Sequence, residues 1–293
     1  MSVRLETLQV ARLAPKLLGD SAALVAAYVT SQLHPTGGFS NRGGDSDLYY
    51  TVFGLQALVA LRSDLPTASV IPYLREFGSG ESLDFVHLGC LARCWAMMPA
   101  AEMTSNTARE LADRLERYRT PEGGYHAAPA AEHGTAYHAF LALSAYQDLG
   151  HEPPAPERIA ASLNALRSAD GAFANEPGCE HGSTPATAAA VTLIRHLGLS
   201  APPGLATWLL SRCLQGGFFA TPQAPVPDLL STATALHALS SLGASVDSVR
   251  ESCLDFIDSL WTSRGAFYGT WADDEPDCEY TFYGLLALGH LAV

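Results

Sequence analysis

Helical segments of two kinds alternate along the chain. Five segments place apolar residues three or four positions apart beside charged ones, as in a helix with one buried face; they span residues 22–33, 106–118, 156–167, 204–214 and 249–261. Six other segments are apolar nearly all round, as buried helices are; they span residues 51–61, 87–98, 138–150, 186–198, 232–243 and 281–291. The alternation predicts outer helices that cover inner ones.

A glycine turn precedes each inner segment and marks a repeat. Its first glycine is residue 37, 78, 123, 171, 216 or 265, so the intervals run from 41 residues (37 to 78) to 49 residues (216 to 265). Six hairpins can form an open solenoid, split into small bundles or close into a ring. The apolar residues 285–293 favour closure, because an open end needs a polar cap. We therefore expect an all-α (α/α)6 barrel of six helical hairpins, a single toroid over residues 1–293.

Charge and composition exclude several classes of function. The 293 residues carry 30 acidic and 17 basic side chains, a formal net charge of −13, which argues against binding to nucleic acid or to an anionic membrane surface. The sequence contains no apolar stretch long enough for a membrane span and no N-terminal signal pattern. The six cysteines are dispersed, so we expect reduced thiols in a cytoplasmic protein.

The first repeat reads GGFSNRGGDSDLYYTVFGLQAL and resembles the repeat of protein prenyltransferase β subunits. The terpene cyclase and squalene–hopene cyclase group carries a related repeat, and the resemblance extends over all six repeats. It implies an α6–α6 barrel whose apolar central cavity holds an isoprenoid chain. For a protein prenyltransferase it also implies a helical partner subunit.

One position in each repeat lies directly before the inner helix, at the mouth of the expected barrel. Every residue there is Asp, Ser or Thr, the types that cap a helix N-terminus by accepting hydrogen bonds from its first N–H groups. Helix capping is therefore the ordinary explanation for each of these residues: Asp47, Asp84, Thr135, Ser183, Asp228 and Asp277.

The prenyltransferase resemblance implies a zinc ion at the mouth, held by Asp, Cys and His from neighbouring repeats. No adjacent pair of repeats here supplies all three. The most plausible transition-metal set is Asp84, His87 and His138, with His87 replacing the thiolate. Asp277 and Glu279, together with Asp47, could instead hold a hard cation such as Mg²⁺. The alternative is that His87 and His138 bind no metal and line the pore, where they form hydrogen bonds with neighbouring groups or water.

The resemblance also implies a site for the diphosphate of a prenyl diphosphate. His133 and His181 lie in Glu-His-Gly strings, Arg42 follows the first glycine turn, and Tyr50 or Tyr280 occupies the expected tyrosine position. Tyr137, one position earlier in the third repeat, is a further candidate for contact with the substrate. Aromatic residues of the inner segments, among them Trp95 and Phe140, are candidates for lining the isoprenoid cavity.

The loops at the mouth are acidic, which complicates a diphosphate site. Twelve carboxylates face Arg42 and the histidines, and such a cluster suits a cation or a carboxylic acid kept neutral by burial. Protonation-initiated terpene cyclases use such an acid in an Asp-x-Asp-Asp motif, which this chain lacks. We expect an isoprenoid-handling enzyme, with a prenyl-diphosphate transferase slightly ahead of a class II-type cyclase. In the cyclase, Asp277, Glu279 and Asp47 are the catalytic candidates. The third hypothesis is a non-catalytic toroid that binds a lipid or a peptide.

Overall fold

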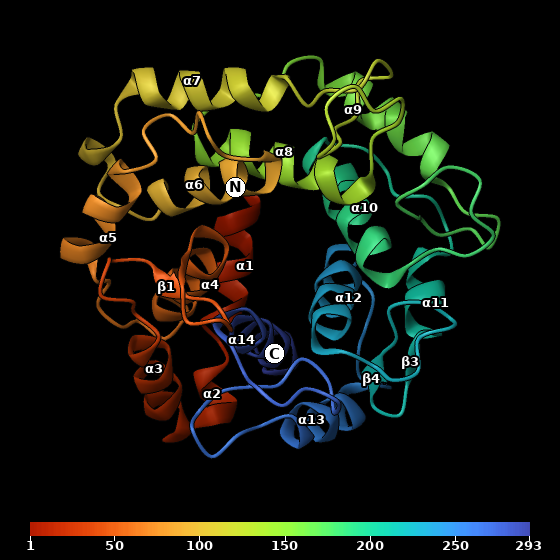
Figure 1. Cartoon of the computed structure of the whole chain (residues 1–293). Helices are drawn as coiled ribbons and strands as arrows, with labels where there is room; N and C mark the ends of the chain where they lie inside the picture. Colours follow the sequence, from red (N-terminus) through yellow and green to blue (C-terminus); the bar gives the residue numbers. More distant parts are fainter.

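Six helices stand side by side around a central axis in the computed structural model, which describes residues 1–293 (Figure 1). Each packs against the next, and the last packs against the first, so the ring is closed. The predicted all-α toroid of six hairpins is confirmed. The inner helices are α4 (Leu48–Ala60), α6 (Phe85–Trp95), α8 (Ala136–Asp148), α10 (Thr184–His196), α12 (Leu229–Ser241) and α14 (Cys278–Leu291).

A second ring of shorter helices covers the first on the outside (Figure 1). These outer helices bury one face only, as Leu111 and Leu115 of the longest of them illustrate, and the other face carries charged residues. They are α3 (Ser21–Ser31), α5 (Thr67–Arg75), α7 (Ser105–Glu116), α9 (Pro156–Ser162), α11 (Leu205–Leu210) and α13 (Arg250–Ser259). The short α2 (Pro15–Leu18) and the 3₁₀ turns Ala100–Glu102 and Leu163–Leu166 complete the helical segments.

The glycine turns join outer to inner helices at one end of the barrel. Two of them form antiparallel pairs, β1 (Phe39–Ser40) with β2 (Ser46–Asp47) and β3 (Cys213–Leu214) with β4 (Gly217–Phe218). In four repeats the aromatic residue of the turn donates its N–H to a threonine hydroxyl in the first turn of the inner helix. The pairs are Phe39–Thr51, Phe173–Thr187, Phe218–Thr232 and Phe267–Thr281.

The six predicted capping residues all cap inner helices. Each side chain accepts a hydrogen bond from an N–H group in the first turn of its own helix. Since all six caps lie at the ends joined by the glycine turns, the N-terminal ends of the inner helices together form the mouth. The prediction of capping is confirmed for every repeat.

An N-terminal helix, α1 (Val3–Ala11), closes the opposite end and forms a floor. It packs on α14, α4 and α8, and its Val3 N–H donates to the side chain of Gln147. Gly289 of α14 permits this contact, because a Cβ there would lie 2.2 Å from the Val10 carbonyl oxygen. Among all these helices, none has the length and apolar character that crossing a membrane requires.

Candidate functional site: the central cavity

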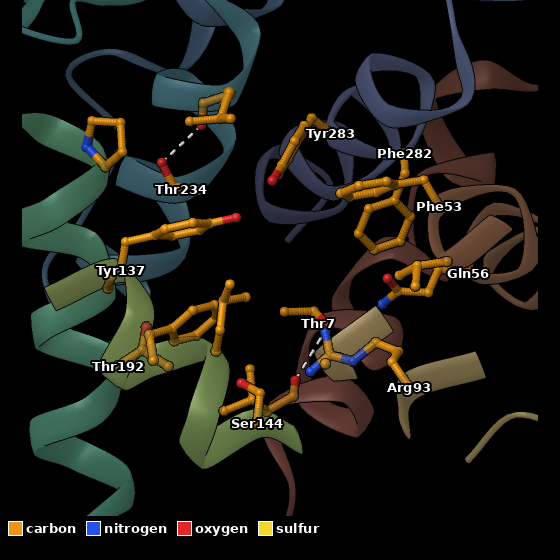
Figure 2. A pocket seen from close by; sticks show the side chains of 18 of the residues that line it. Thr7, Phe53, Gln56, Arg93, Tyr137, Ser144, Thr192, Thr234, Phe282 and Tyr283 are labelled. Atoms are coloured by element: carbon orange, nitrogen blue, oxygen red, sulfur yellow. Dashed lines mark hydrogen bonds between the residues drawn. The ribbon is translucent and has the colours of Figure 1, made fainter. Parts of the chain in front are cut away.

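A cavity of about 250 Å³ lies along the barrel axis. All six inner helices and α1 contribute to its wall, so it opens toward the mouth and ends at the floor (Figure 2). Its lining is mostly apolar, which fits a hydrocarbon ligand better than a polar one.

Aromatic side chains form one wall of the cavity. Tyr49 and Phe53 of α4 meet edge-to-face with ring centroids 5.0 Å apart, and Phe53 lies 6.0 Å from Phe282 and 5.5 Å from Tyr283 of α14. We call these four residues the aromatic wall. Tyr137 of α8 extends from the opposite side (Figure 2). Aromatic faces in such a cavity attract a positive charge held between them.

Glu279 contacts the aromatic wall at the mouth, through Tyr49, and is not itself one of the residues that line the cavity. It occupies the first turn of α14, four residues before Tyr283, so both side chains lie on one face of the helix. The Tyr49 hydroxyl donates a 2.7 Å hydrogen bond to Glu279 Oε1. Burial, and then the charge of Asp277, raise the pKa of Glu279 to about 7 against the opposing effects of Tyr49 and Arg42. A large share of Glu279 is therefore neutral at pH 7 and carries a transferable proton.

The neighbouring Asp277 is engaged differently. It accepts the Tyr280 N–H as the cap of α14 and receives a 2.8 Å hydrogen bond from Arg42 Nε. Arg42 also lies 3.6 Å from Asp273, and its guanidinium is 5.6 Å from the centroid of the Tyr280 ring. The arginine predicted for a diphosphate is thus already paired with two carboxylates, and Tyr280 lies against it rather than in the cavity lining.

His87 lies between two capping aspartates at the mouth. Its Nδ1 is 2.8 Å from Asp84 Oδ1, and its Nε2 is 3.9 Å from Asp47 Oδ2. The carboxylates of Asp47 and Asp84, the second of them hydrogen-bonded, raise the pKa of His87 to about 9. The imidazole is therefore protonated at neutral pH and has no lone pair to offer a metal.

The predicted zinc ligands do not assemble. His138 is hydrogen-bonded through Nδ1 to Thr135, 2.9 Å away, and its ring lies against His126. Nowhere in the structure do three His, Cys, Asp or Glu side chains come together as a metal site requires. Asp84, His87 and His138 therefore do not fit zinc, because each is satisfied within its own helix turn or by a neighbour. The alternative Mg²⁺ set of Asp47, Asp277 and Glu279 is not grouped either.

Other predicted site residues divide into two groups. Tyr137 and Phe140 line the cavity as expected. Trp95 does not: it is buried in the core between the helices. His133 pairs with Glu122 at 2.9 Å, and His181 lies 3.7 Å from Asp170. Both histidines are largely exposed and neither lines the cavity.

Tyr50 also lies outside the cavity lining. Its N–H donates to Asp47, and its hydroxyl is close enough to Asp277 and Glu279 for their charges to contribute to its raised pKa, after burial. The structure therefore places it in the mouth beside the acidic residues. Its neighbour Tyr49 is the one that enters the cavity.

Polar residues gather at the floor, where the sequence analysis had placed none. Arg93 of α6 lines the cavity there, and its Nε donates a 2.7 Å hydrogen bond to the buried Asp148. His237 of α12 lies on another side, with Nδ1 3.1 Å from His290 Nε2. Burial lowers the pKa of His237 to about 4, so it is neutral. The sequence indicated this polar floor only through a single arginine, Arg93, inside the apolar segment 87–98.

The chain matches the family model of the prenyltransferase alpha-alpha toroid domain over residues 13–88, 101–219 and 204–292. It belongs to this family. The resemblance to prenyltransferase and terpene cyclase repeats is thereby confirmed for nearly the whole chain. No sequence among the curated proteins matches it.

Solved structures share the toroid at low identity. The type II terpene cyclase MstE from Scytonema, in complex with geranylgeranyl dihydroxybenzoate, is 14% identical over 98% of both chains, with a TM-score of 0.63. A protein from Actinoplanes is 14% identical over 93% of this chain and 98% of its own, with a TM-score of 0.58. Candida albicans protein geranylgeranyltransferase-I complexed with GGPP is 13% identical over 97% of this chain and 83% of its own, with a TM-score of 0.43.

Proposed function

We propose that this toroid is an isoprenoid-handling enzyme that starts a cyclisation by protonating a carbon–carbon double bond. Glu279 is the acid. The observation that carries the proposal is a partly buried carboxylic acid with a raised pKa, hydrogen-bonded to Tyr49 of the aromatic wall at the mouth of an apolar cavity.

The reaction balances without any added reactant. The Glu279 proton moves to one carbon of a double bond near the mouth, and the adjacent carbon becomes a carbocation. The faces of Phe53 and Tyr283 stabilise that charge, and the π electrons of the next double bond attack it to form a carbon–carbon bond. The final cation gives a proton to water, and Glu279 regains a proton from solvent, so the product is an isomer of the substrate. Tyr49 keeps the acid oriented through its hydrogen bond.

The electrostatics of the mouth favour this reaction over transfer from a prenyl diphosphate. The two cations at the rim, Arg42 and His87, are both paired with carboxylates, and no metal site is present to bridge the remaining acids to a phosphate. The same acids stabilise a positive charge that forms below them. The helical partner subunit and the cytoplasmic location expected from the sequence stay predictions.

The test is product analysis with purified protein, using geranylgeraniol and geranylgeranyl diphosphate as probes and mass spectrometry with chromatography to separate isomers. We expect a cyclised isomer from the wild type and a rate at least about 100-fold lower for Glu279→Gln, since a positioned general acid contributes that much. Glu275→Gln, on the exposed loop before α14, is the matched control and keeps wild-type turnover.

Two results contradict the proposal. Release of pyrophosphate from geranylgeranyl diphosphate, with no cyclised isomer, supports the transferase instead. Binding of both probes without turnover supports the non-catalytic lipid-binding toroid.

A further inference from the structure

The floor of the cavity presents a cation with free hydrogen-bond donors. Arg93 is anchored through Nε alone, and its two terminal NH₂ groups make no hydrogen bond within the protein. Figure 2 shows its guanidinium beside Thr7 and Ser144, at the end of the cavity away from Tyr283. The Arg93 side chain keeps 16% of its surface exposed, so its free donors are accessible to a ligand group in the cavity.

The charge around this arginine is not balanced by its neighbours. Asp148 is the single acid that contacts it, and the same carboxylate also accepts Arg4 Nε at 2.8 Å. One buried carboxylate thus serves two guanidinium groups and leaves one positive charge in excess. The mouth, by contrast, is dominated by carboxylates. The cavity is therefore polarised along its axis, acidic at the mouth and cationic at the floor.

Two further polar side chains lie at the floor, and one of them lacks a partner. The Ser144 hydroxyl is buried and has no hydrogen bond. Gln56 is only 2% exposed. Both side chains line the cavity together with Arg93. Buried polar groups are normally satisfied, so an unsatisfied hydroxyl in the same part of the cavity as Arg93 points to a polar ligand group there.

We propose that the floor binds the carboxylate of an isoprenoid acid, held by Arg93, Gln56 and Ser144, with the hydrocarbon chain running up toward Glu279. Guanidinium NH₂ groups and a carboxylate form charge-assisted hydrogen bonds. A diphosphate fits less well, because its higher charge meets one excess cation that already shares Asp148. For its catalytic consequence the proposal rests on the function proposed above.

A ligand with its carboxylate at the floor would also reduce the repulsion between Arg93 and the carbocation of the proposed reaction. Arg93 lies nine residues past its helix cap and Glu279 two residues past its own, so Arg93 is seven residues, or about 10 Å, deeper in the barrel. A carbocation in the same low-dielectric cavity would be repelled by an uncompensated guanidinium. A bound carboxylate neutralises the guanidinium and leaves the acidic mouth to act on the cation.

The test measures binding and needs no turnover. Calorimetric titration of the intact protein compares geranylgeranoic acid with its methyl ester, for the wild type, for Arg93→Met and for Arg4→Met. Arg4 shares Asp148 but does not line the cavity, so its variant controls for loss of the ion pair. Thermal unfolding confirms that each variant is folded.

We expect the wild type to bind the acid about 10- to 100-fold more tightly than the ester, the range for hydrogen bonds to a charged group. Arg93→Met abolishes this preference and leaves ester binding nearly unchanged, whereas Arg4→Met keeps the preference. Equal affinity of the wild type for acid and ester overturns the inference, even if Arg93→Met fails to fold. Tighter binding of geranylgeranyl diphosphate than of the acid also overturns it.

The two proposals fail separately. Binding of the acid that depends on Arg93, without formation of any cyclised isomer, retains the floor site and rejects the role of Glu279. Cyclisation that depends on Glu279 but makes no distinction between acid and ester retains the function and rejects the floor site.

Discussion

Replacing Glu279 by Gln tests the state of the carboxyl group without reference to any substrate. The substitution keeps the size of the side chain and a polar partner for the Tyr49 hydroxyl, but it removes the titration. If burial makes ionisation of Glu279 unfavourable in the folded protein, the variant must be more stable relative to the wild type at pH values at which the wild-type carboxyl is ionised.

The size of the effect follows from the pKa. The folded-state pKa is about 7 against an ordinary value of 4.5, and each pKa unit corresponds to about 1.4 kcal/mol, so the upper limit is about 3 kcal/mol. Solvent at the rim reduces this to about 1–3 kcal/mol. The folded state binds the proton more tightly than the unfolded chain, so wild-type stability falls as the pH rises from about 4.5 to about 7.

The assay is urea unfolding of wild type and variant at several pH values between 4 and 9. The free energy of unfolding of Glu279→Gln minus that of the wild type should rise by about 1–3 kcal/mol between pH 4.5 and 8. Taking this difference cancels the titration of other groups, among them His87. Glu275→Gln, in the exposed loop, should give a difference that does not change with pH.

A flat difference for Glu279→Gln would falsify the assignment of a raised pKa, and with it the acid of the proposed reaction. A difference that falls with pH would mean that the folded protein stabilises the carboxylate, as for a carboxylate in an ion pair.

Three further changes address the mouth and the floor. His87→Asn should lower the free energy of unfolding by about 1 kcal/mol at pH 6 and by almost nothing at pH 10. The reason is that the ion pairs of His87 are lost as the pH rises through about 9. Urea unfolding at both pH values measures this difference. Arg42→Met should cost about 2 kcal/mol, because Asp277 is buried and loses its cation, and no loss of stability in thermal unfolding would contradict the pairing. Gly289→Val should break the contact between α14 and the Val10 carbonyl of α1 and lower the free energy of unfolding by about 1–3 kcal/mol. The readout is faster tryptic cleavage within α1. Unchanged protection from trypsin would show that α1 does not depend on this contact.

The fold was predictable from the sequence because the two helix types leave distinct patterns. The inner segments, such as 281–291, are apolar on all sides. This is the pattern expected of a helix that other helices cover on every side. The capping residues were equally clear, since a cap acts within its own turn. By contrast, α5 was missed because it is short and carries Pro72, a residue that normally ends a helix. Helix α1 was missed because its partners are side chains distant in sequence, such as Asp148.

The candidate site was only partly predictable. Glu279 could be named as a candidate because its position relative to the cap of α14 could be counted along the chain, and its role as the acid stays a prediction. The zinc set failed because contacts between repeats depend on side-chain directions that no spacing encodes: His87 turns to Asp47 and Asp84, and His138 to Thr135. Arg93 was overlooked because the sequence does not show which residues face an arginine across the cavity, and its role depends on them.

The most direct test of the account is turnover in deuterated water. Protonation at Glu279 takes its hydrogen from a group that exchanges with solvent, so a cyclised isomer formed in D₂O should carry one deuterium at the carbon that was protonated, and Glu279→Gln should form none. Geranylgeranoic acid, its methyl ester and geranylgeraniol serve as substrates, and mass spectrometry locates the label. A cyclised product without deuterium, or its formation at the wild-type rate by Glu279→Gln, would contradict the central claim.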